Sequence, residues 1–286
     1  MNIKKLTLRS ASFPEVLRVI PDPPQELYHL GAPLTELLEK PRLAIVGSRS
    51  PTAYGRQITT RLAGELAERG IVIVSGLALG IDCLAHRAAL EAGGLAVAVL
   101  PGPLDKIVPV TNRRLARQIL AQGGALVSEY ESSTKIYKQN FIARNRLMAG
   151  LAQAVLIPEA AEKSGSLHTA RFALEQGKDV LAVPGNIMSS RSVGANNLIK
   201  RGAAPVTSYR DVLQALGLQE NQAVRQVRGR NIHEQTVLDL MLEGISAGEQ
   251  LLKDSRLAAS EFNQVLTMLE IGGKIRPLGA NQWAIM

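Results

Sequence analysis

From residue 42 onward the chain alternates short, continuous apolar runs with longer segments of helical periodicity, and this pattern strongly restricts the possible folds. The apolar runs are 43–46, 71–74, 95–100, 125–127, 154–157 and 180–183, and the helical segments between them are 56–68, 81–92, 112–121, 144–151 and 167–176. Strands that are apolar at every position belong to sheets covered on both faces, and intervening helices make successive strands parallel. We therefore predict an α/β fold with a doubly wound, mostly parallel sheet that ends near Leu216.

The remaining segments suggest the domain boundaries. Residues 1–40 mix a short apolar alternation with proline-rich turns, so we expect them to extend the main domain of residues 41–216. Residues 217–231 are polar and bear arginines, as expected of a linker. Residues 232–286 contain three short helical patterns and two short strand candidates, which predict a small C-terminal winged-helix domain.

The net charge of +8 is distributed unevenly along the chain. Residues 1–216 hold 26 Lys and Arg against 17 Asp and Glu, a balance of +9, whereas residues 217–286 hold 7 against 8. A basic excess favours a polyanionic partner. Any such partner is therefore expected to bind the first part of the chain.

The third helix expected in the C-terminal domain has a clear buried face. It carries apolar residues at i, i+3, i+4 and i+7, namely Phe262, Val265, Leu266 and Leu269. Its outward positions hold no Lys or Arg, which a DNA-reading helix normally offers to phosphates and guanines. From residue 232 onward there are 4 basic and 7 acidic residues. We expect this domain to dock a protein partner or to play a structural role, and we disfavour a duplex-binding transcription regulator.

Several kinds of chemistry find no support in the residues. The single cysteine, Cys83, excludes a disulfide framework and a cysteine-based metal site, and no histidine pair has zinc-site spacing. Asp82 and His86 are spaced as a hydrogen-bonded pair on one helix rather than as an acid–base couple, so we expect neither a catalytic residue nor a metal. No run approaches the roughly 18 apolar residues of a membrane span, and no signal peptide is apparent, so we expect a cytoplasmic protein.

Residues 138–151 have the most unusual local composition. The first nine hold three cations, three side-chain amides and Phe141, and only then does the segment become apolar. Cations bind phosphates, amides bind base edges and an aromatic ring stacks on a base, so the set suits single-stranded nucleic acid. The alternative is a solvated helix start in which Phe141 anchors the core, and the spacing alone does not decide between the two.

Three loops that follow predicted strands carry small residues where a helix begins, at 47–50, 75–82 and 164–171. Carboxyl ends of parallel strands share one sheet edge, where doubly wound folds bind ligands, so we expect these loops and the 138–151 segment to meet there. In the first loop Ser48, Arg49 and the backbone N–H groups of a helix N-terminus predict a phosphate site. The G-x-G-x-x-G dinucleotide fingerprint is absent. Taken singly, each loop is also consistent with ordinary turn chemistry.

These segments together resemble the bacterial DNA-processing protein A family, also called DprA or Smf. The resemblance covers about residues 13–216 and rests on an ordered series of motifs: Gly47-Ser48-Arg49, Ser75-Gly76-Leu77-Ala78, Asn140-Phe141, Arg144-Asn145-Arg146, Ser164-Gly165-Ser166-Leu167, Ala182-Val183-Pro184-Gly185 and Asn197-Leu198-Ile199. It implies an extended Rossmann-like domain that binds and protects single-stranded DNA, forms a homodimer and loads the RecA recombinase in natural transformation and homologous recombination. It implies neither catalysis nor a cofactor.

The resemblance also assigns site residues. Transferred family positions imply DNA contacts by Ser48, Arg49, Lys138, Asn140, Phe141, Arg144, Asn145, Gly165, Ser166 and Thr169. The dimer surface is implied near Asn197, Leu198 and Ile199. Three residues depart from the family pattern, namely Ile142, Pro158 and His168. The first two could shift the loop geometry, and His168 could add a donor to the DNA site or merely cap it.

An enzyme is the alternative class. Nucleotide-cleaving phosphoribohydrolases have a related core and a similar first loop, but their later loop carries Pro-Gly-Gly-x-Gly-Thr-x-x-Glu. The comparable segment of this chain, residues 164–171, has no such carboxylate. The residues therefore favour a binding protein over an enzyme.

Overall fold

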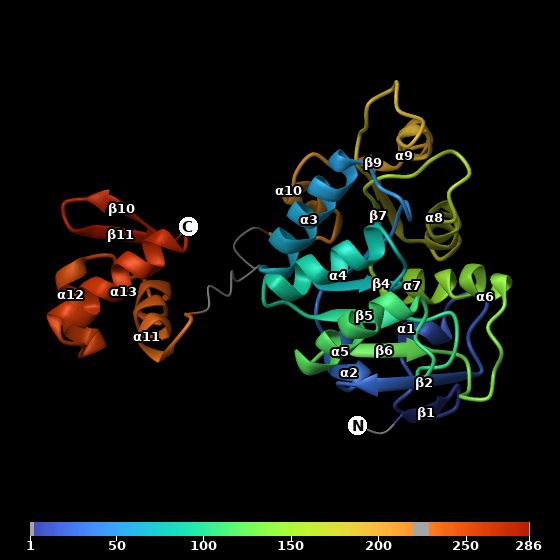
Figure 1. Ribbon diagram of the computed structural model, residues 1–286, viewed down its shortest axis with the longest axis horizontal. Coiled ribbons are helices and arrows are strands. Elements are labelled where there is room, and N and C mark those ends of the chain that lie inside the picture. Colours follow the sequence, from blue (N-terminus) through green and yellow to red (C-terminus); the bar gives the residue numbers. More distant parts are fainter. Residues whose placement is uncertain (1–2, 220–228, 286) are drawn as a thin grey trace. The chain divides into compact units, whose positions relative to one another are not determined.

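The computed structural model describes residues 3–219 and 229–285, which form two compact units (Figure 1). The larger unit contains the main β-sheet, and the smaller one contains the C-terminal helices. Of the expected linker, residues 220–228 lie outside the described residues.

The larger unit alternates strands and helices as its sequence predicts. Its strands are β1 (Lys4–Thr7), β2 (Glu26–Gly31), β3 (Arg42–Ile45), β4 (Val72–Ser75), β5 (Ala96–Val99), β6 (Ala125–Ser128), β7 (Ala154–Ile157), β8 (Asp179–Ala182) and β9 (Ala204–Pro205). Its α-helices are α1 (Glu15–Arg18), α2 (Leu34–Leu38), α3 (Ala53–Ala67), α4 (Ile81–Glu91), α5 (Arg113–Ala121), α6 (Lys138–Ala143), α7 (Asn145–Leu151), α8 (Ser166–Glu175), α9 (Val193–Lys200) and α10 (Tyr209–Ala215), with a 3-10 turn, η1 (Val110–Asn112). The six apolar runs form β3 to β8. Strands β1, β2 and β9 lack such runs and give no comparable signal.

The strand order shows the class of the fold. Among the described residues the sheet has nine strands, in the order β1-β2-β6-β5-β4-β3-β7-β8-β9. Neighbours from β6 to β9 are parallel, and β2 and β1 continue the sheet in antiparallel fashion. The run β5-β4-β3-β7-β8-β9 has the 3-2-1-4-5-6 order of a Rossmann-like fold. Its order reverses between β3 and β7, and ligands of such folds bind outside the carboxyl ends of the strands at this point.

Strand β3 shows why the apolar runs are continuous. Leu43 and Ile45 pack with α3 and α4, whereas Ala44 and Val46 pack on the opposite side with α1, α7 and α8. All four side chains are buried. Because successive side chains of a strand point to opposite faces, a sheet between two helical layers requires apolar residues at every position.

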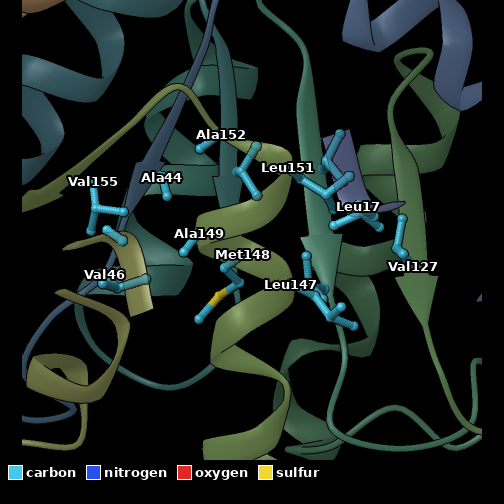
Figure 2. Packing of buried hydrophobic residues seen from close by; sticks show 14 of the residues in the cluster. Leu17, Ala44, Val46, Val127, Leu147, Met148, Ala149, Leu151, Ala152 and Val155 are labelled. Atoms are coloured by element: carbon cyan, nitrogen blue, oxygen red, sulfur yellow. The ribbon is translucent and has the colours of Figure 1, made fainter. Parts of the chain in front are cut away.

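Helix α7 is anchored in the core beside the carboxyl edge. Leu147, Met148 and Leu151 are buried and pack among strand side chains and Leu17 of α1 (Figure 2). A Cβ at position 150 would lie 2.6 Å from the Leu17 side chain, so Gly150 permits this close approach. This anchoring fixes the position of the polar residues that precede α7.

Of the three cations in residues 138–151, Arg146 serves the fold. Its guanidinium forms ion pairs with Glu129 at 2.6 Å and with Asp22 at 2.8 Å, and its side chain is 9% exposed. The carboxylates of Glu129 and Asp22 raise the pKa of Arg146 against the opposing effect of burial. This side chain therefore ties α7 to two loops and is not available to a ligand.

The smaller unit has its own apolar core. It consists of α11 (Ile232–Leu242), α12 (Gly248–Ser255), α13 (Ala259–Ile271), and the antiparallel strands β10 (Ile275–Gly279) and β11 (Gln282–Ile285). The face predicted for the third helix is buried, with Phe262, Val265, Leu266 and Leu269 packed against Val237 and Leu238 of α11. Three helices followed by a hairpin match the element order expected of a winged-helix domain.

Candidate functional site

A pocket of about 490 Å³ lies at the reversal point between β3 and β7. It is formed by the loops after β3, β4, β7 and β8 together with the end of α6 and the start of α7. Eight of the ten predicted DNA contacts line it: Ser48, Arg49, Phe141, Arg144, Asn145, Gly165, Ser166 and Thr169. Segments far apart in the sequence are thus brought together at the carboxyl edge of the sheet.

The other two predicted contacts lie outside the pocket wall. Lys138 is exposed at the start of α6, and Asn140, two residues later, is buried. Ile142, which departs from the family pattern, lines the pocket and is 43% exposed. Helix α6 therefore presents Phe141 and Ile142 to the pocket, while Lys138 extends the positive charge beyond it.

Arg49 and Phe141 form a cation–aromatic pair on the pocket wall. The guanidinium carbon of Arg49 lies 5.3 Å from the centroid of the Phe141 ring, within the range of a cation–π contact. Arg49 is exposed and Phe141 is half-buried. Phe141 belongs to none of the apolar clusters of the described residues, so the interpretation of this ring as a core anchor is wrong.

Arg144 holds the loops of the pocket together from within. Its side chain is 3% exposed, and its Nη1 donates to the carbonyl oxygens of Val99 and of Gly76, the latter at 2.8 Å. Burial lowers its pKa to about 10, and the Asp82 carboxylate opposes that shift. Any side chain at position 76 would collide with this guanidinium, which explains the glycine there. Arg144 therefore positions the site and supplies positive potential from beneath its surface.

Asn145 connects the same arginine to the loop after β7. Its Oδ1 accepts from Arg144 Nε at 3.2 Å, and its Nδ2 donates to the Gly165 carbonyl at 3.3 Å. Ser166 is buried beside it, and its Oγ lies 2.8 Å from that of Ser164. The predicted contacts on α7 and α8 are thus mainly buried groups that shape the pocket, whereas Arg49 and Gly165 are exposed.

Asp82 and His86 do not form the predicted hydrogen-bonded pair. Asp82 accepts instead from the Gly76 N–H at 3.1 Å, and burial raises the pKa of its carboxyl although Arg144 and backbone donors oppose this. His86 is fully buried, and desolvation lowers its pKa to about 3. The i, i+4 spacing is correct, but the loop after β4 folds back over Asp82 and takes its carboxylate.

The backbone phosphate site predicted at the N-terminus of α3 is also not formed. The Glu159 carboxylate accepts from the Thr52 N–H at 3.1 Å and from the Thr52 hydroxyl, and the Glu159 carbonyl accepts from the Ser48 N–H at 2.9 Å. The Thr52 hydroxyl in turn accepts from the Gly55 N–H and caps the helix. The protein's own carboxylate therefore occupies this helix terminus, whereas the side chain of Arg49 in the same loop is exposed.

Two cations of the pocket escaped the sequence-based prediction. Lys163 and Arg191 line it and are exposed. Lys163 directly precedes the predicted loop motif, so its position offered a weak signal, whereas Arg191 comes from the loop after β8 and has no local signature. His168, in contrast, lines a different pocket between α8 and α9 and gives no donor to this one.

The pocket combines positive charge with stacking and hydrogen-bonding groups. Its cations are Arg49, Arg144, Lys163 and Arg191, and its acidic residue is Asp82, whose raised pKa disfavours the charged form. Within the described residues no group of three or more His, Cys, Asp or Glu side chains is arranged to hold a metal ion. Likewise, no helix of residues 3–219 or 229–285 has the length and apolar composition needed to cross a membrane.

Topology and pocket position define a Rossmann-like protein with its candidate site at the switch point of the sheet. Residues 4–217 match the family described as DNA recombination-mediator protein A, and the chain belongs to this family. DNA processing protein DprA of Bacillus subtilis (strain 168) is 40% identical over 214 residues, which are 75% of this chain and 71% of that protein. Protein Smf of Escherichia coli (strain K12) is 44% identical over 207 residues, covering 72% of this chain and 55% of that protein.

A solved structure supports the same assignment. DNA processing protein A from Helicobacter pylori, described for its single-stranded DNA binding mode, matches with a TM-score of 0.66 at 38% identity. The match covers 75% of this chain and 95% of that one. The larger unit accounts for the family match, because residues 4–217 lie within it.

Proposed function

We propose that the pocket binds single-stranded DNA and that the protein is a non-catalytic recombination mediator of the cytoplasm. The pairing of Arg49 with Phe141 on the pocket wall carries this proposal. A cation for a phosphate beside an aromatic ring for a base is the combination with which proteins hold unpaired strands. The H. pylori relative, described as binding single-stranded DNA, supports the transfer.

One further feature favours an unpaired strand over a duplex. Phe141 is half-buried, so its ring can stack only on a base that enters the pocket. Bases of a duplex are already stacked on one another, so an unpaired base suits this ring better.

A gel shift with the whole chain tests DNA binding. We expect single-stranded oligonucleotides to bind more tightly than duplexes of the same sequence, with an affinity that falls as salt rises. Arg49→Ala should weaken binding and reduce the log–log salt slope by about 0.7, the value for one phosphate contact on a single strand. Lys40→Ala, which removes an exposed charge before β3 at the opposite sheet edge, is the control. Equal affinity for duplex, or no effect of Arg49→Ala, would contradict the proposal.

We further propose that the protein protects incoming DNA and loads RecA recombinase as a homodimer. The supporting observation is the membership in a recombination-mediator family. Asn197, Leu198 and Ile199 remain the proposed dimer surface; they are half-buried on α9, where Leu198 and Ile199 pack partly against the core.

Sedimentation and filament assembly test these two points separately. Asn197→Arg places a charge on the proposed dimer surface and should shift the sedimentation coefficient from dimer to monomer. RecA filament assembly on single strands coated with their binding protein should be accelerated by the parent protein. A monomeric parent would refute the dimer, and an unchanged assembly rate would refute loading.

The smaller unit is proposed to be a winged-helix domain that docks a protein partner. Its charge supports this, since residues 232–286 hold 4 basic and 7 acidic residues. A duplex-specific footprint that depends on residues 232–286 would instead indicate a DNA-reading domain.

A further inference from the structure

A second hollow, the α4/α5 groove, runs between helices α4 and α5 and measures about 550 Å³. The side chains used here are Arg87, Thr111, Asn112, Arg114, Gln118 and Gln122, which line it. One carboxylate, Glu91, lines it as well. The pocket at the reversal point between β3 and β7, called the DNA pocket below, is also lined by guanidinium and amide groups. Unlike that pocket, the groove has no aromatic ring.

Helix α5 separates its residues sharply into two faces. Leu115, Ala116 and Ile119 are buried against the sheet. Arg113, Arg114 and Arg117 are exposed, and the helix contains no acidic residue. Among the described residues none of these arginines has an ion-pair partner, and neither has the exposed Arg87 of α4. Four unpaired guanidinium groups on neighbouring helices form a cationic surface suited to phosphates.

The groove adjoins the DNA pocket through the loop after β4. Ala78 of this loop lines the DNA pocket, and a Cβ at Gly80 would lie 2.2 Å from the Ser48 carbonyl. At the other side of the loop, Asn112 Nδ2 donates to the Leu77 carbonyl at 2.8 Å. The residues of this loop are thus held directly between the two hollows.

Helix α5 runs from the DNA pocket toward the opposite edge of the sheet. The helix follows β5, so its N-terminal residues lie at the carboxyl edge of the sheet, beside the DNA pocket, and its C-terminal residues lie toward the opposite edge. Its nine residues span about 13 Å at 1.5 Å per residue. Gln122 Nε2 donates to the Leu90 carbonyl at 3.4 Å and joins the helices at the far end.

We propose that the α4/α5 groove is a second segment of the single-stranded DNA path, in which Arg87 and Arg114 bind the phosphates of nucleotides outside the pocket. The inference rests on the proposed DNA binding by the pocket and adds a track for the strand that leaves it. Because the groove offers positive charge without a stacking ring, it binds the sugar–phosphate backbone of the DNA and does not distinguish between bases.

Binding of short and long strands distinguishes the groove from the pocket. The probes are labelled oligothymidylates of about 6 and about 20 nucleotides, a range that brackets typical single-strand site sizes. The variant Arg87→Ala/Arg114→Ala should bind the short strand like the parent. For the long strand, the slope of log affinity against log salt concentration should fall by about 1.4, twice the value for one phosphate contact. This change corresponds to about a 25-fold loss of affinity near 0.1 M salt.

Two controls make the result decisive. Lys4→Ala/Lys40→Ala removes two exposed charges, one on the edge strand β1 and one before β3, that line neither hollow, and should leave the binding of both oligonucleotides unaffected. Arg49→Ala should weaken both strands. A double groove variant that binds the long strand like the parent, or that weakens both strands equally, overturns the groove proposal. Unchanged short-strand binding by Arg49→Ala overturns the proposed function of the pocket instead.

Discussion

The guanidinium of Arg49 faces the ring of Phe141 at 5.3 Å, which joins the loop after β3 to helix α6. Arg49 is exposed, whereas Phe141 is half-buried. The contact holds the Arg49 side chain beside the ring, and under the proposed function this preorganises the two side chains to receive a phosphate and a base together.

This pair should act as a unit in DNA binding. Phe141→Ala should cost about 1 to 3 kcal/mol of single-strand affinity through lost stacking. The double variant Arg49→Ala/Phe141→Ala should lose about 0.5 to 1 kcal/mol less binding free energy than the two single variants lose together. Each single variant already removes the cation–π contact, so the sum of the two single losses includes that contact twice. Fluorescence anisotropy at one fixed salt concentration measures the cycle.

A second pair provides the matched control. The guanidinium carbon of Arg171 also lies 5.3 Å from the centroid of the Phe172 ring, but neither residue lines the pocket that holds Arg49 and Phe141. Arg171→Ala and Phe172→Leu should leave single-strand affinity unchanged. Strict additivity at Arg49 and Phe141 would show that their contact plays no part in binding.

Arg144 should be essential to stability. Arg144→Met leaves the buried Gly76 and Val99 carbonyls without their donor and removes the positive charge that opposes the raised pKa of Asp82, which should cost about 1 to 3 kcal/mol. Adding Asp82→Asn should recover part of this loss, since the second change removes the uncompensated group. Urea denaturation of both variants measures the difference, with the exposed Arg61→Met as a control. Further destabilisation by Asp82→Asn would show that this carboxyl is not the source of the cost.

His86 should make the protein less stable in mild acid. Its folded pKa is about 3, whereas an unfolded histidine titrates near 6.5, so between these values the unfolded chain binds more protons. The contribution of His86 to the free energy of unfolding is therefore fully present above pH 6.5 and decreases as the pH falls toward 3. Between pH 7 and pH 5 the loss should be about 2 kcal/mol. Urea titrations of the parent and of His86→Leu measure it, and an equal decline in both would exclude His86 as the cause.

Glu159 should stabilise the start of α3. Glu159→Ala leaves the Thr52 N–H and hydroxyl without their buried acceptor, which should cost about 1 to 3 kcal/mol of unfolding free energy. Glu159→Gln keeps an acceptor and should cost less. Thermal unfolding of the two variants compares them, and equal losses would show that the negative charge, rather than the hydrogen bond, stabilises the helix start.

Much of the fold follows from short-range pattern. Strands β3 to β8 and the helices between them match the apolar runs, because a strand between two helical layers must be apolar at every position. Strands β1 and β2 have alternating or polar residues. Strand β2 gains its place from pairing with β6, and β1 from pairing with β2, and the contact with β6 is a long-range one without a local signature. Similarly, Arg191 joins the pocket only because β8 lies beside β7.

The sequence by itself determined the class of fold, the chemistry of residues 138–151 and the edge of the sheet at which the loops meet. Tertiary structure alone decided which charges face a ligand. It turned Arg144 and Arg146 inward to carbonyl and carboxylate partners, gave the N-terminus of α3 to Glu159, and left Arg49 exposed beside Phe141. The physical reason is that the sequence fixes the type of each side chain, whereas burial and the competition among nearby partners fix whether its charge is paired within the fold or stays exposed at the surface.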